Sequence, residues 1–166
     1  MPSVAGLGHV GIYTHNLSKM RDFYSRVMGL EITDEEIEER GIVFMSSNPE
    51  EEHHEFVLMK GRDVPEGSKM VQQISFYVNE LAELKDFHQI FLDEKVRIER
   101  TVSHGNAFGM YALDPEGNTM RYTIELVFLS LNHAQIPSIY KTPKNLLSPR
   151  LNLEFLHRNF ENFLAN

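Results

Sequence analysis

The sequence contains no cysteine. Disulfides, zinc–thiolate centres and cysteine nucleophiles are therefore excluded. Basic residues are also scarce, because 16 Lys and Arg stand against 24 Asp and Glu and the formal net charge is −8. A protein that binds nucleic acid needs a basic face for the phosphates, so this balance argues against such a partner.

Long apolar runs are missing as well. No segment approaches the roughly 18 consecutive apolar residues of a membrane-spanning helix. Residues 1–10 lack the basic and apolar regions of a signal peptide, so we expect no membrane contact and a cytoplasmic location. The Gly-Leu-Gly segment at 6–8 precedes a strand rather than a helix, which does not fit a dinucleotide-binding loop. With 166 residues, of which 42% are hydrophobic, the length suits one globular domain, or two very small modules that share one core.

The sequence repeats itself at an offset of 64 positions. The Asp-Phe pair at 22–23 returns at 86–87, and further along the offset widens to 66. There the Asn-Pro-Glu segment at 48–50 corresponds to Asp-Pro-Glu at 114–116. Several segments matching in register are best explained by an internal duplication.

Each copy predicts one helix and four strands. Apolar residues at helical spacing over 17–28 follow a β-rich run, with Asn16 or Ser18 as the N-cap and Gly29 as the terminating residue. The strands expected in the first copy are 9–14, 30–33, 42–46 and 55–59. The second copy predicts a helix at 80–93 and strands at 73–78, 96–102, 107–113 and 119–126.

The predicted fold class is therefore α+β, built from two βαβββ units at residues 5–60 and 70–126. A linker rich in glycine and proline joins the units, and together they form one domain over 1–126. Residues 127–166 are a C-terminal extension outside the repeat. Apolar residues at helical spacing over 151–164 predict an amphipathic helix there, which would pack on the body or on a partner.

The motifs of both copies resemble the vicinal oxygen chelate superfamily, which includes glyoxalase I, bleomycin-resistance proteins and extradiol ring-cleavage dioxygenases. The resemblance covers about residues 5–126. It implies two βαβββ units paired around one cavity, and it looks closest to the extradiol branch. The motifs that carry it are Gly-His-Val-Gly-Ile at 8–12, Asp-Phe-Tyr at 22–24, Met-Gly-Leu at 28–30, His-His-Glu at 53–55 and Asp-Pro-Glu-Gly-Asn at 114–118.

The resemblance implies a metal site that takes one residue from the first and one from the last strand of each unit. In this sequence those positions hold His9, Glu55, Gln73 and Arg121. Arginine is a poor ligand because its guanidinium has no acceptor and stays cationic. The implied ligand set is therefore His9, Glu55 and Gln73. Nitrogen and oxygen donors of this kind suit Fe or Mn first, and Ni or Zn after them.

The resemblance also implies catalytic positions. His54 stands where relatives shuttle a proton, and His104 and Tyr111 stand where they contact a phenol. Histidine is the natural acid–base group near neutral pH, and a tyrosine hydroxyl can hold a phenolate or enolate oxygen. In a regular strand His54 and Glu55 face opposite sides, so only a local bulge would let both act in one site.

Three functional hypotheses remain open. The preferred one is a metal-free enzyme acting on a phenolic, aromatic or polyketide-like compound, in which Arg121 and Gln73 bind the substrate and histidines move protons. The second is a metal-dependent extradiol-type dioxygenase that uses His9, Glu55 and Gln73. The third is a non-catalytic binding protein of the resistance type. All three take a small molecule as partner.

The sequence also allows a prediction of how the chain associates and of which side chains line its cavity. Relatives of this size are often homodimers, and the apolar face of the C-terminal extension could cover a neighbouring copy, so we expect a homodimer. An aromatic substrate would pack in an apolar cavity. The side chains expected to line it are Phe44, Met45, Met59, Phe76, Met110 and Tyr122.

Overall fold

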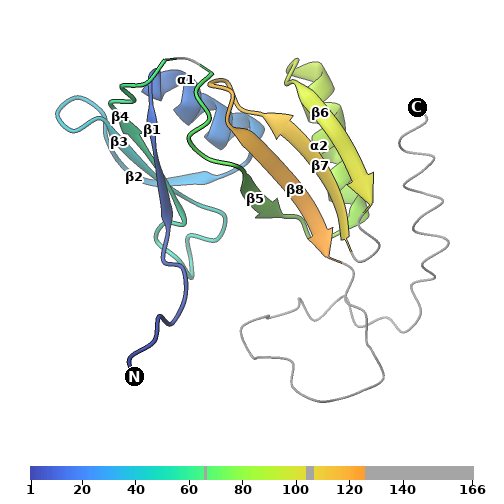
Figure 1. Ribbon diagram of the computed structural model, residues 1–166, viewed down its shortest axis with the longest axis horizontal. Helices are drawn as coiled ribbons and strands as arrows, with labels where there is room; N and C mark the ends of the chain where they lie inside the picture. The colour runs from blue at the N-terminus through green and yellow to red at the C-terminus, as the bar shows by residue number, and fades with distance from the viewer. Residues whose placement is uncertain (66, 104–106, 126–166) are drawn as a thin grey trace.

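The computed structural model describes residues 1–65, 67–103 and 107–125 (Figure 1). Within these residues the strands form two four-stranded sheets, with the orders β1-β4-β3-β2 and β5-β8-β7-β6. In each sheet the first strand of the unit pairs in parallel with the last strand, and the remaining pairs are antiparallel. Both the C-terminal extension and its expected helix lie outside the described residues, so the division into a domain and an extension stays a prediction.

The order of elements confirms the α+β prediction of two βαβββ units. The first unit comprises β1 (Val10–Thr14), α1 (Leu17–Asp22), a π-helical turn η1 (Phe23–Val27), β2 (Glu31–Glu36), β3 (Ile42–Ser46) and β4 (Phe56–Lys60). The second comprises β5 (Ile74–Tyr77), α2 (Leu81–Asp93), β6 (Ile98–Ser103), β7 (Ala107–Leu113) and β8 (Thr119–Glu125). None of the helices among the described residues is long and apolar enough to cross a membrane.

The first helix begins and ends where the sequence predicts, but its second half, η1, is π-helical instead of α-helical. Asn16 caps α1 by accepting a hydrogen bond of 3.0 Å from the Lys19 N–H, and Gly29 follows the helix with a φ of +77°. Between them the N–H of Met28 reaches back five residues to the Phe23 carbonyl at 3.0 Å. Hydrophobic spacing does not reveal such a π turn, because the same apolar residues still face the core.

The acidic segment after Thr33 differs from expectation. The sequence predicts a strand that ends at residue 33, whereas β2 continues to Glu36. Asp34 and Glu36 pair with Phe44 and Ile42 of β3, after a register shift between Ile32 and Asp34. Because β2 is an edge strand with exposed carboxylates, the charges stay in water and discourage pairing with another sheet.

One apolar core runs through both units. The helix α1 packs on β4 and α2 packs on β8, and Figure 1 shows α2 behind the second sheet. Tyr24 of the first unit lies within ring contact of Phe76 in the second, at 6.3 Å between centroids. The largest fully buried side chains come from both halves of the repeat: Met20, Tyr24, Met45, Leu58, Leu84, Phe91, Phe108, Met110, Met120 and Tyr122.

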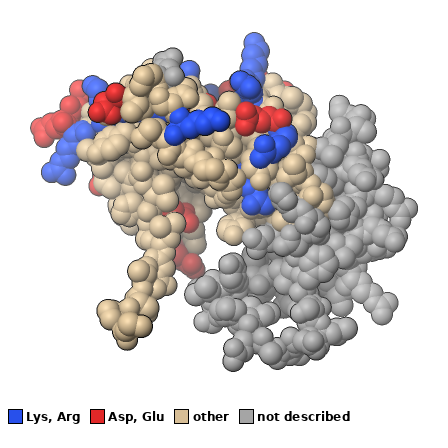
Figure 2. All heavy atoms as spheres, in the orientation of Figure 1, with Lys and Arg blue, Asp and Glu red and all other residues tan. Residues whose placement is uncertain are grey.

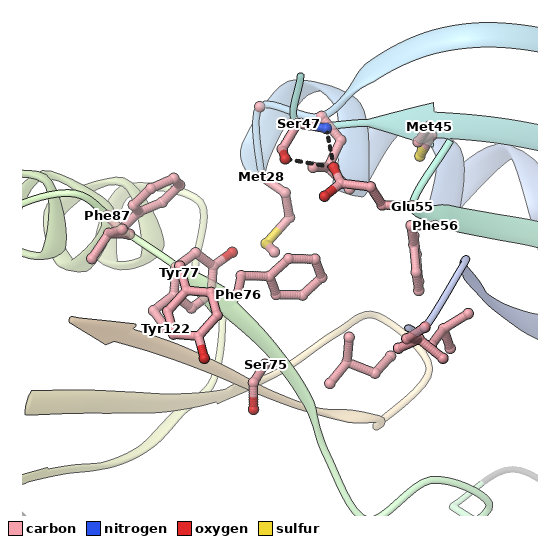
Figure 3. A pocket seen from close by; sticks show the side chains of 16 residues that line it. Met28, Met45, Ser47, Glu55, Phe56, Ser75, Phe76, Tyr77, Phe87 and Tyr122 are labelled. Carbon is pink, nitrogen blue, oxygen red and sulfur yellow. Dashed lines mark hydrogen bonds between the residues drawn. The ribbon is translucent and has the colours of Figure 1, made fainter. Parts of the chain in front are cut away.

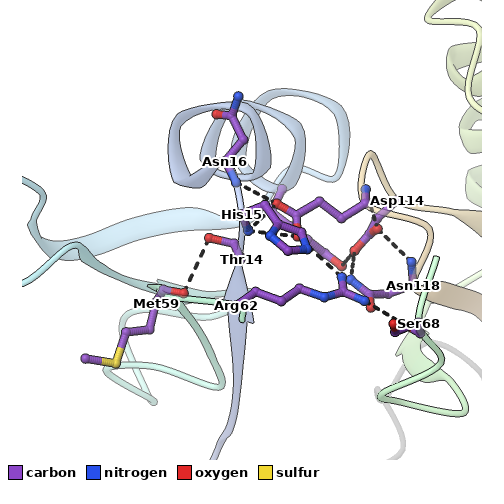
Figure 4. Close-up of polar contacts among 10 residues, drawn as sticks. Thr14, His15, Asn16, Met59, Arg62, Ser68, Asp114 and Asn118 are labelled. Atoms are coloured by element: carbon purple, nitrogen blue, oxygen red, sulfur yellow. Dashed lines mark hydrogen bonds and ion pairs between the residues drawn. The ribbon is translucent and has the colours of Figure 1, made fainter. Parts of the chain in front are cut away.

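A buried polar turn also ties the units together (Figure 4). The carboxylate of Asp114 accepts backbone N–H groups from Glu116 and Asn118 at 2.9 and 2.8 Å. It also accepts the side-chain amide of Asn118 at 2.7 Å and the hydroxyl of Tyr24 at 3.0 Å. The Asp-Pro turn of the second unit is therefore closed on itself and anchored to the helix of the first.

Glu116 extends this connection to the end of β1. Its carboxylate accepts the backbone N–H groups of His15 and Asn16 at 2.8 Å, directly before α1. Arg62 pairs with the same carboxylate at 3.4 Å, and the two side chains are only 4% and 7% exposed. Because the first turn of α1 needs acceptors for its free N–H groups, Glu116 acts as a cap supplied by the other unit.

Charges on the visible face are mixed. Figure 2 shows Lys, Arg, Asp and Glu side chains interspersed along the upper part of this face. Pairs such as Arg21–Glu35 and Arg26–Glu94 join opposite charges at 2.5 and 2.6 Å. Such exposed pairs contribute little to stability, whereas breaking the buried pair of Arg62 and Glu116 would leave a charge without its partner in the interior.

Candidate functional site

Each sheet turns one face toward the helices and the other face away from them. In β1 the side chains of Ile12 and Thr14 are buried, whereas Gly11 faces Val57 on the other side, with 3.7 Å from its ideal Cβ to the Val57 Cβ. Since side chains alternate along a strand, His9 falls on the Gly11 side. The first predicted site residue therefore lies on the sheet face that the helix does not cover.

His9 is part of a histidine cluster, which we define as His9, His53 and His54. The rings of His9 and His54 are 4.6 Å apart between centroids, and Phe44 packs edge-on against His54 at 5.0 Å. The Nδ1 atoms of His53 and His54 lie 2.9 Å apart. One of them must donate and the other accept, so the tautomers of these two rings are coupled.

The carboxylate of Glu55 contacts Ser47 and not the histidine cluster. One of its carboxylate oxygens accepts both the backbone N–H of Ser47 at 2.8 Å and the hydroxyl of Ser47 at 2.5 Å (Figure 3). His54 and Glu55 thus have different partners, and both precede β4, which begins at Phe56. A carboxylate held by two donors is oriented before any ligand arrives.

The second sheet carries an arginine–tyrosine cluster, which we define as Arg100, Tyr111 and Arg121. Tyr111 and Arg121 are register partners on β7 and β8, while the neighbouring Met110 and Tyr122 belong to the core under α2. The guanidinium carbon of Arg100 lies 4.1 Å from the centroid of the Tyr111 ring, and that of Arg121 lies at 5.8 Å. Cations over an aromatic face are attracted by the ring quadrupole.

The charge of this cluster is not balanced within the described part of the chain. There, neither Arg100 nor Arg121 forms an ion pair. The Nε of Arg121 is buried and has no hydrogen-bond partner among the described residues. Two cations beside one ring repel each other, so an anion placed between them would be stabilised.

Gly109 and the edge strand β5 shape the space around Arg121. A Cβ at Gly109 would lie 3.2 Å from the Arg121 Nε, so the missing side chain makes room for the guanidinium. Ser75 is the register partner of Arg121, and Gln73 donates its side-chain amide to the Ser75 hydroxyl at 2.8 Å. Alternation along β5 places Gln73 and Ser75 on the same sheet face as Arg121.

The predicted site residues thus fall into separate environments. His9 and His54 belong to the histidine cluster, Glu55 is held by Ser47, and Gln73 stands beside Ser75 near Arg121 and Tyr111. His104 lies outside the described residues. The catalytic, substrate-binding and metal-binding roles assigned to these residues stay predictions.

Two residues around Tyr111 and Arg121 were not predicted from the sequence. Arg100 is the register partner of Tyr111 across β6 and β7, and Gly109 leaves space for the Arg121 guanidinium. Neither belongs to a motif. Both emerge only when the strand register is known, because three separate strands bring these side chains together.

The donor set around these positions does not fit a metal centre. The described residues contain no group of three or more His, Cys, Asp or Glu that could hold a metal ion. Glu55 and Gln73 are engaged by serine hydroxyls, and Arg121 brings a positive charge to the fourth position. The set of His9, Glu55 and Gln73 stays a prediction that these contacts do not favour.

A cavity of about 350 Å³ lies between the two units (Figure 3). Val10 of β1 and several residues of β5 line it, whereas the predicted site residues His9, Gln73 and Arg121 are not part of its described lining. Of the six side chains expected to line it, Met45, Phe76 and Tyr122 do so. The described lining is Leu7, Val10, Met28, Gly29, Leu30, Met45, Ser47, Glu55, Phe56, Ile74, Ser75, Phe76, Tyr77, Val78, Phe87 and Tyr122.

The sequence profile of the Glyoxalase/Bleomycin resistance protein/Dioxygenase superfamily matches residues 6–122. The chain belongs to this superfamily. The match spans both units of the repeat and confirms the resemblance at the level of the superfamily. No curated protein sequence matches the chain. The extradiol branch, the homodimer and the cytoplasmic location stay predictions.

Solved structures agree on the fold. An integron cassette protein from the mobile metagenome of the Halifax Harbour sewage outfall has a TM-score of 0.60 and 23% identity, over 72% of this chain and 98% of that one. Lactoylglutathione lyase from Agrobacterium tumefaciens has a TM-score of 0.57 and 18% identity, over 74% and 95%. The fosfomycin resistance protein FosX from Listeria monocytogenes has a TM-score of 0.59 and 14% identity, over 72% and 91%. At these identities the likeness concerns the fold alone.

Proposed function

We propose that this chain is a metal-independent enzyme that binds a small phenolate or enolate through Arg121 and moves a proton on it with His54. The observation that carries the proposal is the guanidinium of Arg121. Its Nε is buried and lacks a partner among the described residues, and the resemblance implies that position 121 corresponds to a metal ligand in relatives. A cation there takes over the charge-stabilising role that a metal has in related sites.

The electrostatics favour an oxyanion at this place. Two opposite unit charges about 4 Å apart attract each other by about 4 kcal/mol at an effective dielectric near 20. Part of that energy is offset by the loss of water around both charges. Arginine also offers a planar fork of donors that matches the two oxygens of a chelating enolate or catecholate.

The histidine cluster supports the acid–base part of the proposal. His54 shares a hydrogen with His53 through the two Nδ1 atoms, so a change of protonation at one ring changes the tautomer of the other. A pair of this kind can take up a proton at one nitrogen and release one at another. His54 directly precedes β4 of the first sheet and Arg121 lies on β8 of the second, so the proposal requires a ligand that reaches from the arginine–tyrosine cluster to the histidine cluster.

The test separates binding from turnover. The chain is titrated calorimetrically with 4-nitrocatechol and with acetylacetone, and spectral change is followed with and without a chelator. We expect Arg121→Gln to weaken binding at least tenfold, and His54→Gln to abolish turnover while affinity is kept. Arg97→Gln is the matched control, because Arg97 is a 76% exposed arginine in the same unit.

Two results would contradict the proposal. One is unchanged affinity in a folded Arg121→Gln variant, and the other is turnover that chelation removes. Tight binding that depends on Arg121 but never leads to turnover would instead identify a binding protein of the resistance type.

A further inference from the structure

The cavity between the units differs chemically from the face that carries Arg121. Its single charged residue among the described lining is Glu55, and most other lining residues are apolar or aromatic. Among the lining residues Ser47, Glu55 and Ser75 are exposed, whereas Met28, Met45 and Tyr122 are buried. Ser75 is also the register partner of Arg121, so it neighbours both places. A volume of about 350 Å³ falls within the range of small-molecule sites.

The carboxylate of Glu55 is oriented by Ser47 and can bind a cation. Ser47 holds one carboxylate oxygen through two hydrogen bonds, and the other oxygen has no hydrogen bond among the described residues. Met28 and Phe76 line the same cavity as Glu55, and Figure 3 shows the Glu55 carboxylate with its hydrogen bonds to Ser47. A fixed carboxylate above an apolar wall suits an ammonium group attached to an aryl or alkyl body.

Tyr122 supplies a second, independent observation. The residue is 1% exposed and lines the cavity, and its hydroxyl has no hydrogen-bond partner among the described residues. A buried hydroxyl without a partner costs about 1–3 kcal/mol, so a ligand atom that bonds to it is stabilised. Burial raises the pKa of the Tyr122 phenol well above 10.0, so the group keeps its proton and can donate.

We infer that this cavity is a second ligand site, which binds a small aromatic amine with its ammonium on Glu55 and its ring against Phe76. A polar substituent at the far end of the ring would reach Tyr122, which lies on the other side of Phe76 from Glu55 in Figure 3. The site selects cations, whereas the arginine–tyrosine cluster selects anions. It does not depend on the function proposed above.

Three probes with the same ring and chain length test the inference. The full chain is titrated with phenethylamine, with tyramine, which adds a phenolic hydroxyl, and with 3-phenylpropionate, which carries an anion instead of the amine. We expect saturable binding of one phenethylamine per chain, tighter binding of tyramine by about threefold to tenfold, and no cavity binding of 3-phenylpropionate.

Two variants test which residues contact the ligand, and a third tests whether this site is separate from the proposed anion site. Glu55→Gln keeps the shape of the side chain, can still accept from Ser47, and should weaken phenethylamine at least tenfold. Tyr122→Phe should leave phenethylamine unchanged and remove the advantage of tyramine. Arg121→Gln should leave the affinity for phenethylamine unchanged, which separates this site from the proposed anion site.

The NMR signals of the methionine methyl groups can show where phenethylamine binds. Met28 and Met45 line the cavity, whereas Met59 and Met110 are not part of its described lining. In methyl-labelled protein, phenethylamine should shift the signals of Met28 and Met45 and leave those of Met59 and Met110 in place. Absence of saturable binding up to about 10 mM, equal affinity in a folded Glu55→Gln variant, or shifts confined to Met59 and Met110 would each overturn the inference.

Discussion

The hydroxyl of Tyr24 donates a hydrogen bond of 3.0 Å to the carboxylate of Asp114, across the boundary between the two units. Burial raises the pKa of the Tyr24 phenol well above 10.0, and the nearby Asp114 carboxylate raises it further. The phenol therefore keeps its proton and acts as the donor. This bond joins the first helix of one unit to the Asp-Pro turn of the other, so it fixes how the two sheets sit beside the cavity.

Removal of the Tyr24 hydroxyl should lower the stability of the protein. Because hydrogen bonds to charged groups contribute about 1.5–3 kcal/mol, Tyr24→Phe should lower the free energy of unfolding by that amount. Denaturant unfolding measures the change. Tyr13→Phe is the control, since Tyr13 is 60% exposed and its replacement should change stability by less than about 0.5 kcal/mol. Equal effects of the two changes would contradict the importance of the Tyr24 bond.

Asp114 should give the fold a distinctive pH dependence. Burial raises its pKa above the ordinary 3.8, although hydrogen bonds from Asn118, Glu116 and Tyr24 oppose the shift. A raised carboxyl pKa means that the contribution of Asp114 to stability is complete below pH 3.8 and is lost as the pH rises through the folded-state pKa. Asp114→Asn removes this titration.

Unfolding of both proteins between about pH 3 and pH 7 measures the effect. The advantage of the wild type over Asp114→Asn, in free energy of unfolding, should shrink as the pH rises from 3.8 through the raised pKa. A growing advantage over the same window would show that the hydrogen bonds outweigh burial and that the folded-state pKa is lowered instead.

Removal of the cation from the buried pair of Arg62 and Glu116 should cost more than removal of a cation from an exposed pair. Arg62→Met leaves the carboxylate of Glu116 buried without its cation, which should cost about 3–5 kcal/mol of unfolding free energy. Arg21→Met, which breaks the more exposed pair with Glu35, should cost at most about 1 kcal/mol. In the double variant Arg62→Met with Glu116→Gln, the loss should be smaller than the sum of the single losses.

Gly41 should tolerate no side chain. Its φ is +64°, and a Cβ there would lie 2.8 Å from the Cβ of Lys60. Gly41→Ala should therefore destabilise the protein by more than about 1 kcal/mol. Gly11→Ala serves as comparison, because the new Cβ meets Val57 at an ordinary 3.7 Å. Thermal unfolding should show a clearly lower midpoint for Gly41→Ala than for Gly11→Ala.

Metal affinity should respond to the charge at position 121. The change Arg121→Glu replaces a cation by an anion, and each unit charge about 4 Å from another contributes about 4 kcal/mol at an effective dielectric near 20. Combined with Gln73→His, it should raise the affinity for Fe²⁺ or Mn²⁺ well above that of the wild type, as measured by elemental analysis after anaerobic loading. Near-stoichiometric iron in the wild type, with catechol cleavage lost in His9→Ala, would instead favour the dioxygenase hypothesis.

The local sequence was sufficient to predict the two units. Apolar spacing, the cap at Asn16 and the glycine at 29 act within a few residues, so they define helix and strand positions before any tertiary contact forms. The repeat then predicted which strands are equivalent, and the sheet orders confirm it. Extension of β2 to Glu36 escaped prediction because it depends on pairing with β3.

The chemistry of the sites depended on tertiary structure to a much greater degree. Sequence motifs pointed to His54, Tyr111 and Arg121, but only the strand register brings Arg100 onto the Tyr111 ring. No motif links Ser47 to Glu55, or Arg62 to a carboxylate that lies 54 positions away. Contacts of this kind are made between segments remote in the chain, and their formation depends on how the two sheets pack. For that reason local patterns determined the elements of this protein, while the packing of its two units determined which charges remain without partners and where a ligand can bind.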